Sequence, residues 1–163
     1  MENRLGRARS IEVYNIWKKT LAVQTGQDLR RRRAASPRVV ASMFLEKTLV
    51  TTINYASSLN QIRRYKEAKS LLCKAVPVAR RILGDSIDVT LKLRWLYGRV
   101  LYRDDGATLD DLREAVTTLE DVERIARRVF GGAHPLTTET ERDLQFARGT
   151  LAAHESQSPG SSY

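Results

Sequence analysis

The residues best suited to recognition chemistry are three cations and a tryptophan at helical spacing. They are Lys92, Trp95, Arg99 and Arg103, and intervals of three and four place them on one face of a helix. Lysine and arginine donate charge-assisted hydrogen bonds to carboxylates, and the face of a tryptophan ring attracts cations. Such a face could hold an acidic segment or the C-terminus of a peptide. The alternative is a solvated helix face on which Trp95 packs between neighbouring units.

The other chemistry-bearing residues are too few for an active site. Histidine occurs only at positions 134 and 154, and Cys73 is the single cysteine. A nucleophilic cysteine needs a nearby base and an orienting group, so we expect Cys73 to be a small core residue. The sequence offers no serine–histidine–aspartate set, phosphate-cradling glycine loop or metal-ligand cluster. We therefore predict a protein that is not an enzyme and takes no cofactor or metal.

Four aspartates between positions 104 and 111 superficially suggest a calcium loop. Their spacing lacks the alternating ligands and the closing glutamate of such a loop. Thr108 followed by Asp111 instead predicts a capping box, in which side chain and backbone bond reciprocally at the start of a helix.

Positive charge is concentrated near the N-terminus of this chain, whose net charge is +9. Residues 1–40 carry ten Lys and Arg against three acids, whereas the remainder carries 18 against 16. We expect a basic arm and a divergent helix over 1–36, a nearly neutral body over 37–154 and a disordered tail over 155–163. The arm contains a run of four arginines, Arg30, Arg31, Arg32 and Arg33. This run could bind phosphates of RNA, DNA or lipids. The alternative is that it is simply a solvated run of charges.

The composition predicts one soluble helical domain. Nine glycines and four prolines in 163 residues are few, and β-branched alternation is scarce. No apolar run approaches the roughly 20 residues of a membrane span, and the start lacks a signal-peptide core. We expect an intracellular, cytoplasmic protein.

Caps, breakers and apolar periodicity set the expected helices. Gly84 should end one helix as a left-handed cap. The buried stripe of the helix that begins at Pro37 should include Met43, Phe44, Thr48 and Leu49. The expected helices cover residues 10–25, 37–59, 65–83, 87–102, 109–130 and 135–154.

Two stretches, residues 79–90 and 126–137, repeat the same order of residue types at an interval of 47. Two others, 48–59 and 90–101, align at an interval of 42. The difference places a five-residue insertion in one turn of the second unit, where loops tolerate it. Repeats of this length are typical of stacked two-helix units, in which each pair buries an apolar face against the next.

The repeated units carry recognisable residues, including Asn-Tyr-Ala at 54–56, Tyr-Lys-Glu-Ala at 65–68 and Gly131 followed by His134-Pro135. Over about residues 42–153 the chain resembles the tetratricopeptide repeats of kinesin light chains. Leu96 and the Ile-Asp pair at 87–88 depart from that family's pattern. The resemblance implies an all-α fold, a right-handed superhelical solenoid of stacked helix pairs, and a scaffold or adaptor that binds proteins.

In that family the first helix of each pair lines a concave groove. The resemblance therefore implies a groove that also includes Val50, Ile53, Glu139 and Phe146, and that binds an acidic protein or peptide. A different interpretation is a structural subunit of a large assembly, such as a ribonucleoprotein, docked through the basic arm. The predicted partner-binding residues are Asn54, Asn60, Lys92, Trp95, Arg99, Tyr102, Arg103 and Arg142.

Overall fold

The computed structural model describes residues 37–157, with side chains from 43 to 156. All regular structure in this part is helical. The helix bounds agree with the expected ones to within three residues, and residues 155–157, expected to be disordered, are helical. The expected helix over 10–25, the arginine run at 30–33 and residues 158–163 lie outside this part. The helices are α2 (Pro37–Gln61), α3 (Tyr65–Leu83), α4 (Asp88–Arg103), α5 (Leu109–Phe130) and α6 (Pro135–Gln157).

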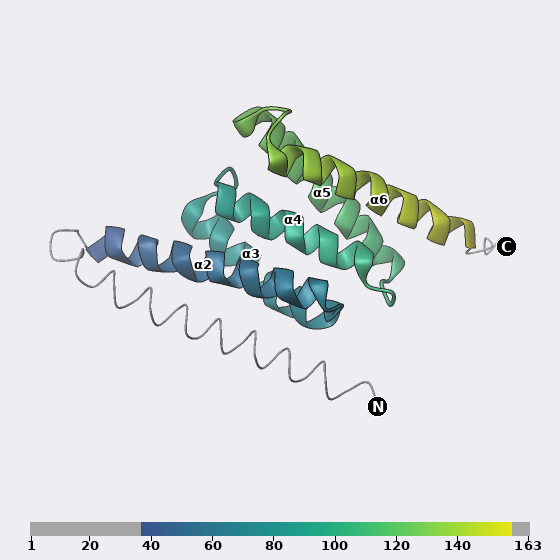
Figure 1. Ribbon diagram of the computed structural model, residues 1–163, viewed down its shortest axis with the longest axis horizontal. Coiled ribbons are helices and arrows are strands. Elements are labelled where there is room, and N and C mark those ends of the chain that lie inside the picture. Colours follow the sequence, from purple (N-terminus) through teal and green to yellow (C-terminus); the bar gives the residue numbers. More distant parts are fainter. Residues whose placement is uncertain (1–36, 158–163) are drawn as a thin grey trace.

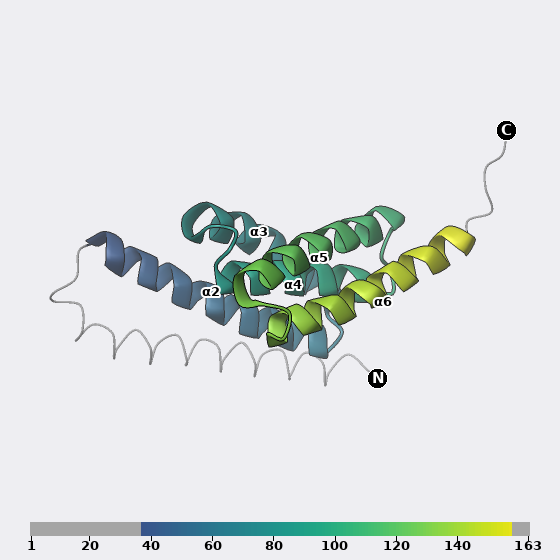
Figure 2. The same ribbon diagram turned by 90° about the horizontal axis from the view of Figure 1, so that it is seen from above.

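The helices lie in two layers (Figure 1). Helices α2, α4 and α6 form one layer, and α3 and α5 form the other, as the view from above shows (Figure 2). Each helix packs against the next one in the chain, and α4 also contacts both α2 and α6. Helix α4 is therefore the central element, and the rest of the fold is positioned by what packs on its two sides.

Small residues let the two layers approach closely. Ala56, Ala68 and Ala115 are fully buried. A Cβ atom added at Gly98 would lie 2.8 Å from Cγ of Leu119, which is shorter than carbon atoms approach one another. The backbone of α4 thus rests directly on α5.

The apolar core forms one cluster on one side of α4 and is divided on the other. Ten buried apolar residues from α2, α3 and α4 form one cluster. On the side of α5 and α6 there are two separate clusters of three, one around Leu91 and one around Leu119, and further buried residues of α5 outside them. Trp95 packs against all three clusters, which makes this side chain the link between the two halves of the core.

The start of α2 differs from the expected buried stripe. Met43 is 44% exposed, Phe44 is 37% exposed and Thr48 is exposed, whereas Leu49 is buried. With 25 residues, α2 is longer than α3 with 19 or α4 with 16. Its first turns extend past α3 and α4 (Figure 1), so periodicity alone assigned too many of its residues to the core.

The turns after α3 and α5 have the same backbone geometry, 47 residues apart. Gly84 has φ 94° and ψ 165°, and Gly131 has φ 87° and ψ 167°. Each glycine amide donates to the carbonyl four residues earlier, at 3.1 Å and 3.0 Å. The cap predicted at Gly84 has the expected positive φ, but its ψ is extended, so it is not the left-handed helical cap. Backbone in this region is essentially restricted to glycine.

The capping box predicted at the start of α5 is confirmed. The amide of Asp111 donates to Oγ1 of Thr108 at 3.1 Å, and Oδ2 of Asp111 accepts from the amide of Thr108 at 3.2 Å. Nζ of Lys69 on α3 also donates to Oδ1 of Asp111 at 2.6 Å. This hydrogen bond is the main reason that the pKa of Asp111 lies below its ordinary value.

Candidate functional site

A hollow of about 350 Å³ lies over α4, between residues of α2 and α6. Helix α2 contributes Ile53 and helix α4 contributes Lys92 and Trp95. All three helices of one layer therefore meet at one concave site, although 86 residues separate the ends of its lining in the chain. The complete lining is Ile53, Lys92, Trp95, His134, Pro135, Leu136 and Glu139.

Beside this hollow, a buried carboxylate on α6 accepts hydrogen bonds from residues of α4. Asp143 is only 3% exposed. Nε1 of Trp95 donates to its Oδ2 at 2.7 Å, and the hydroxyl of Tyr102 donates to its Oδ1 at 2.8 Å. A buried charge is tolerated only when it is paired and hydrogen-bonded. These two donors from α4 therefore fix α6 in register against α4.

Arg99 supplies the positive charge that compensates Asp143. Its Nε lies 3.4 Å from Oδ2 of Asp143, and its guanidinium lies over the ring of Trp95, with Cζ 4.9 Å from the centroid. That Nε has no partner with hydrogen-bond geometry within the described residues. The contact is thus an ion pair combined with a cation–π contact, and the Arg99 side chain is only 25% exposed.

The environment of Tyr102 holds its hydroxyl protonated. Burial is the largest cause, and the negative charge of Asp143 and the hydrogen bond to it add to the effect. Together they raise the pKa of Tyr102 to about 12. Tyr102 is therefore a hydrogen-bond donor to Asp143 at any physiological pH.

Three of the predicted groove residues thus serve the protein's own packing. Trp95, Arg99 and Tyr102 converge on Asp143, a residue that the sequence-based prediction did not include. Packing between neighbouring units, which was the alternative interpretation of Trp95, matches the position of this side chain in the structure. Its indole N–H is occupied, but its ring still lines the hollow.

The other predicted groove residues are divided between surface and interior. Asn54, Arg103 and Arg142 are exposed, and Lys92 pairs with Asp88 on its own helix at 2.7 Å. Asn60, in contrast, is 6% exposed, and its Oδ1 has no hydrogen-bond partner among the described residues.

The sequence-based prediction missed two buried charges, Asp143 and Arg94. Asp143 falls at helical spacing with Leu136, Thr140 and Ala147, all of which are buried. An acid inside an apolar stripe is a signal for a paired buried charge, and it could have been read from the sequence. Arg94 is 6% exposed.

Arg94 bridges α4 to α5 and to the preceding turn. Its Nη2 lies 3.3 Å from Oδ2 of Asp121, and its Nη1 lies 4.0 Å from Oδ1 of Asp85. Burial lowers the pKa of Arg94. This arginine therefore ties α4 to α5 and to the turn between α3 and α4.

His134 is used by the turn that precedes α6. Its Nδ1 accepts a hydrogen bond from the amide of Leu136 at 3.2 Å. Its ring stacks on Phe130, with centroids 4.6 Å apart. These contacts give the imidazole a structural role in closing the turn at the edge of the hollow.

Cys73 is exposed rather than buried as we expected. It follows the buried Leu72 on α3, and its Sγ lies 3.5 Å from the hydroxyl of Tyr97. One position along a helix rotates a side chain by about 100°, which is enough to turn it from core to solvent. Within the described residues, no group of three or more His, Cys, Asp or Glu is arranged to hold a metal ion.

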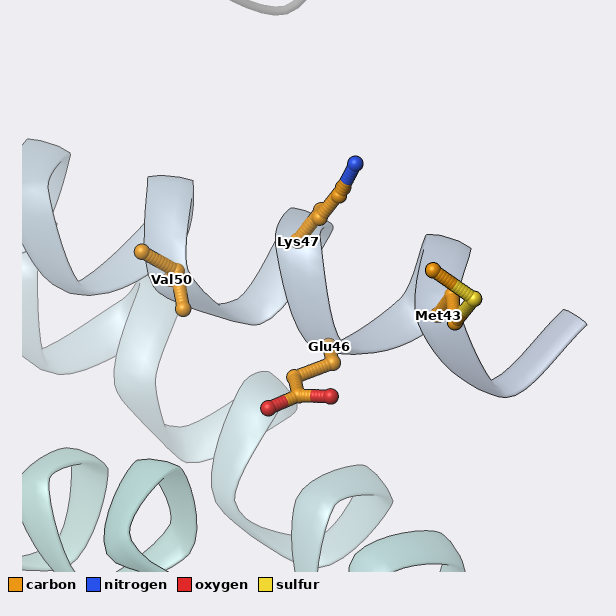
Figure 3. A pocket seen from close by; sticks show the side chains of 4 residues that line it. All are labelled: Met43, Glu46, Lys47 and Val50. Atoms are coloured by element: carbon orange, nitrogen blue, oxygen red, sulfur yellow. The ribbon is translucent and has the colours of Figure 1, made fainter. Parts of the chain in front are cut away.

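A second hollow, of about 270 Å³, lies along the first half of α2 (Figure 3). Glu46 and Lys47 point to opposite sides of the helix there. Its described lining comes from α2 alone, so it does not join separate elements as the first hollow does. The residues are Met43, Glu46, Lys47 and Val50.

Comparisons of the chain with protein-family models, with curated proteins and with solved structures find no match. The resemblance to tetratricopeptide repeats therefore stays a prediction. None of the helices between residues 37 and 157 is long and apolar enough to cross a lipid bilayer.

Proposed function

We propose that the chain is a protein-interaction scaffold of the tetratricopeptide type, a right-handed superhelical solenoid, and that its α2–α4–α6 face binds a segment of a partner protein. The observation that carries this proposal is the hollow to which all three helices contribute. Binding sites are typically concave, mostly apolar and provided with a few polar groups. Ile53, Leu136 and Trp95 supply the apolar part here, and Lys92 and Glu139 supply charges.

The chemistry of the face favours an apolar anchor flanked by acids. Trp95 offers only its ring, because its N–H is bonded to Asp143. Arg103 and Arg142 are exposed and form no ion pair with any residue from 43 to 156. The segment would place an apolar side chain in the hollow and direct its carboxylates to these arginines.

The position of Arg99 determines which variants can test this proposal. A glutamate at position 99 would lie beside the buried Asp143, and the repulsion would disturb the fold itself. The clean test of the positive charge therefore changes the exposed residues Arg103 and Arg142.

The test starts from a random peptide library selected on the full chain. We expect selected peptides to combine a large apolar residue with nearby acids. Ile53→Trp, which fills the hollow, should weaken their binding at least tenfold, about 1.4 kcal/mol. The double change R103E/R142E should weaken it by a similar factor.

Val50 was expected in the same groove, but it lines the other hollow of α2 and not this one. Val50→Trp therefore provides the matched control, because it adds the same side chain to the same helix. It should leave the affinity unchanged. Thermal melting by circular dichroism would check that each variant folds. Equal binding to wild type and Ile53→Trp would overturn the assignment of this face.

The alternative, a structural subunit of a large assembly, depends on the basic arm, which lies outside the described residues. It stays a prediction that deletion of residues 1–36 would test.

A further inference from the structure

The outer face of α3 carries a row of exposed residues that lies away from the hollow. Within α3 they recur at intervals of four, four, three and four, so they form one straight row about 22 Å long. The buried residues of this helix, Ala68, Leu72 and Ala79, lie on its opposite face. The row consists of Lys66, Ser70, Lys74, Pro77 and Arg81, all exposed.

Within the described residues, the positive charges of this row have no acidic partner. Lys66, Lys74 and Arg81 form no ion pair with any residue from 43 to 156. Exposed Arg63, in the turn before α3, adds a fourth cation close to its start, also without an ion pair to residues 43–156. The nearest acid on the helix is Glu67, which is engaged by Arg64 of the same turn.

Charges elsewhere on α3 are paired, which sets the row apart. Lys69 donates to Asp111 at 2.6 Å. Arg80 donates to Asp85 at 2.5 Å. In the part of the chain that the structure describes, cations that support the fold thus have acidic partners, and those of the row do not.

The equivalent face of α5 serves as an internal comparison. The repeat interval of 47 places Asp110 where the first unit has Arg63 and Asp121 where it has Lys74. On α5, Arg113 pairs with Asp110 at 3.8 Å, and Arg124 pairs with Asp121 at 2.5 Å. The same surface of the second unit is therefore nearly neutral, so helical geometry alone does not require a positive row.

We propose that the outer face of α3 binds the phosphate backbone of a nucleic-acid duplex. A duplex carries one negative charge per roughly 1.7 Å of axis, so a straight row of cations can meet phosphates in several registers. The row contains no aromatic side chain on which an unpaired base could stack. It also lacks a large apolar side chain of the kind that enters a lipid interface. A duplex backbone is the polyanion that needs neither.

The experiment measures binding of fluorescein-labelled duplex DNA and duplex RNA to the full chain by anisotropy over a range of salt concentrations. The variant K66Q/K74Q/R81Q removes the three positive charges of the row. Its affinity should fall at least tenfold at low salt. The slope of log K against log salt should become shallower by about 2.7, since each phosphate contact contributes about 0.9.

The variant R113Q/R124Q/R128Q is the matched control, because it removes the same net charge from the equivalent face of α5. It should change the affinity by less than about twofold, and circular dichroism would confirm that both variants fold. An equal loss in the two variants would show attraction by net charge alone and overturn the proposal. Unchanged binding by K66Q/K74Q/R81Q would assign any duplex binding to the N-terminal arm and would also overturn it.

Two further probes distinguish other polyanions. If removal of the row weakens binding to phosphatidylserine vesicles more than binding to duplexes, the face belongs to a membrane. If it weakens binding to polyglutamate more, the face belongs to an acidic protein. Either result contradicts the proposal, whereas a loss confined to the duplexes supports it. The row lies outside the hollow, so these outcomes are independent of the peptide-binding test.

Discussion

The two sides of α4 are held by different physical means. Towards α2 and α3, ten buried apolar residues form one cluster. Towards α5 and α6, two small apolar clusters lie apart, and on α6 Asp143 lies buried with Trp95, Tyr102 and Arg99 around it. The first contact gains free energy roughly in proportion to the apolar area buried, and it is not directional. The second requires particular atoms to meet at particular distances.

The two interfaces therefore have different roles. The apolar one mainly stabilises the fold, and the polar one sets the register of α6 on α4. An apolar interface tolerates changes of shape if its volume is kept. A buried carboxylate with two donors and an arginine allows one alignment of α6 on α4, because any slip would leave charges unpaired. The hollow lies at this second interface, so the geometry of the proposed binding site depends on the polar contact more than on the large core.

The largest expected effect comes from Asp143→Ala. It leaves the donors of Trp95 and Tyr102 and the charge of Arg99 without their partner, and breaking a buried pair typically costs about 3–5 kcal/mol. Hydrogen exchange should show amides of α6 exchanging faster, while those of α2 and α3 change little. Denaturant unfolding would measure the total loss.

Leu96→Ala is the matched change on the apolar side of α4, where Leu96 is 1% exposed. It should cost about 2–5 kcal/mol, with faster exchange in α2 and α3 as well as in α4. The same exchange pattern in both variants would contradict the separation of the two interfaces.

A smaller, pH-dependent effect is expected from Tyr102→Phe, which removes one donor to Asp143. A hydrogen bond to a charged group contributes about 1.5–3 kcal/mol, so stability at neutral pH should fall by about 1.5 kcal/mol. The folded-state pKa of Tyr102 is raised to about 12, above the ordinary value near 10. Its contribution is therefore complete below about pH 10 and is lost as pH rises towards 12.

Urea unfolding at a series of pH values would test this. Wild type should lose stability between pH 10 and 12 more steeply than Tyr102→Phe does. Parallel curves would show that folding does not raise the pKa of Tyr102.

The smallest expected effects separate two equivalent threonines at the starts of α4 and α6. Both are fully buried, but Oγ1 of Thr137 donates to the carbonyl of Gly131 at 2.9 Å, whereas Oγ1 of Thr90 has no partner within the described residues. Thr137→Val should therefore destabilise by about 1 kcal/mol. Thr90→Val should be neutral or slightly stabilising, and thermal melting compares them directly. A loss of the same size at both positions would show that the hydrogen bond is not the cause.

Local patterns in the sequence predicted the helices because local interactions determine helix ends. Thr108 and Asp111 bond each other across three residues, and Gly84 and Gly131 break helices through their own backbone. Such signals depend only on neighbouring residues. They gave helix bounds without any knowledge of the tertiary fold.

The candidate site was harder to predict because its contacts are distant in the chain. Asp143 lies 41 and 48 residues from the donors that it joins, and helical spacing alone cannot distinguish a side chain facing solvent from one facing another helix. Lys92 and Trp95, which spacing places on one helix face, line one hollow. Spacing did not reveal that Arg99 and Tyr102 are held by an internal carboxylate, nor that Asn60 is buried.

The position of Trp95 makes it an intrinsic fluorescence reporter. Its indole donates to Asp143, lies under the guanidinium of Arg99 and lines the hollow. The only other tryptophan in the sequence is Trp17, so a Trp17→Phe chain would emit from this single position. Wavelength and quenching of that emission would then report whether α6 is docked on α4 and whether the hollow is occupied, without any attached dye.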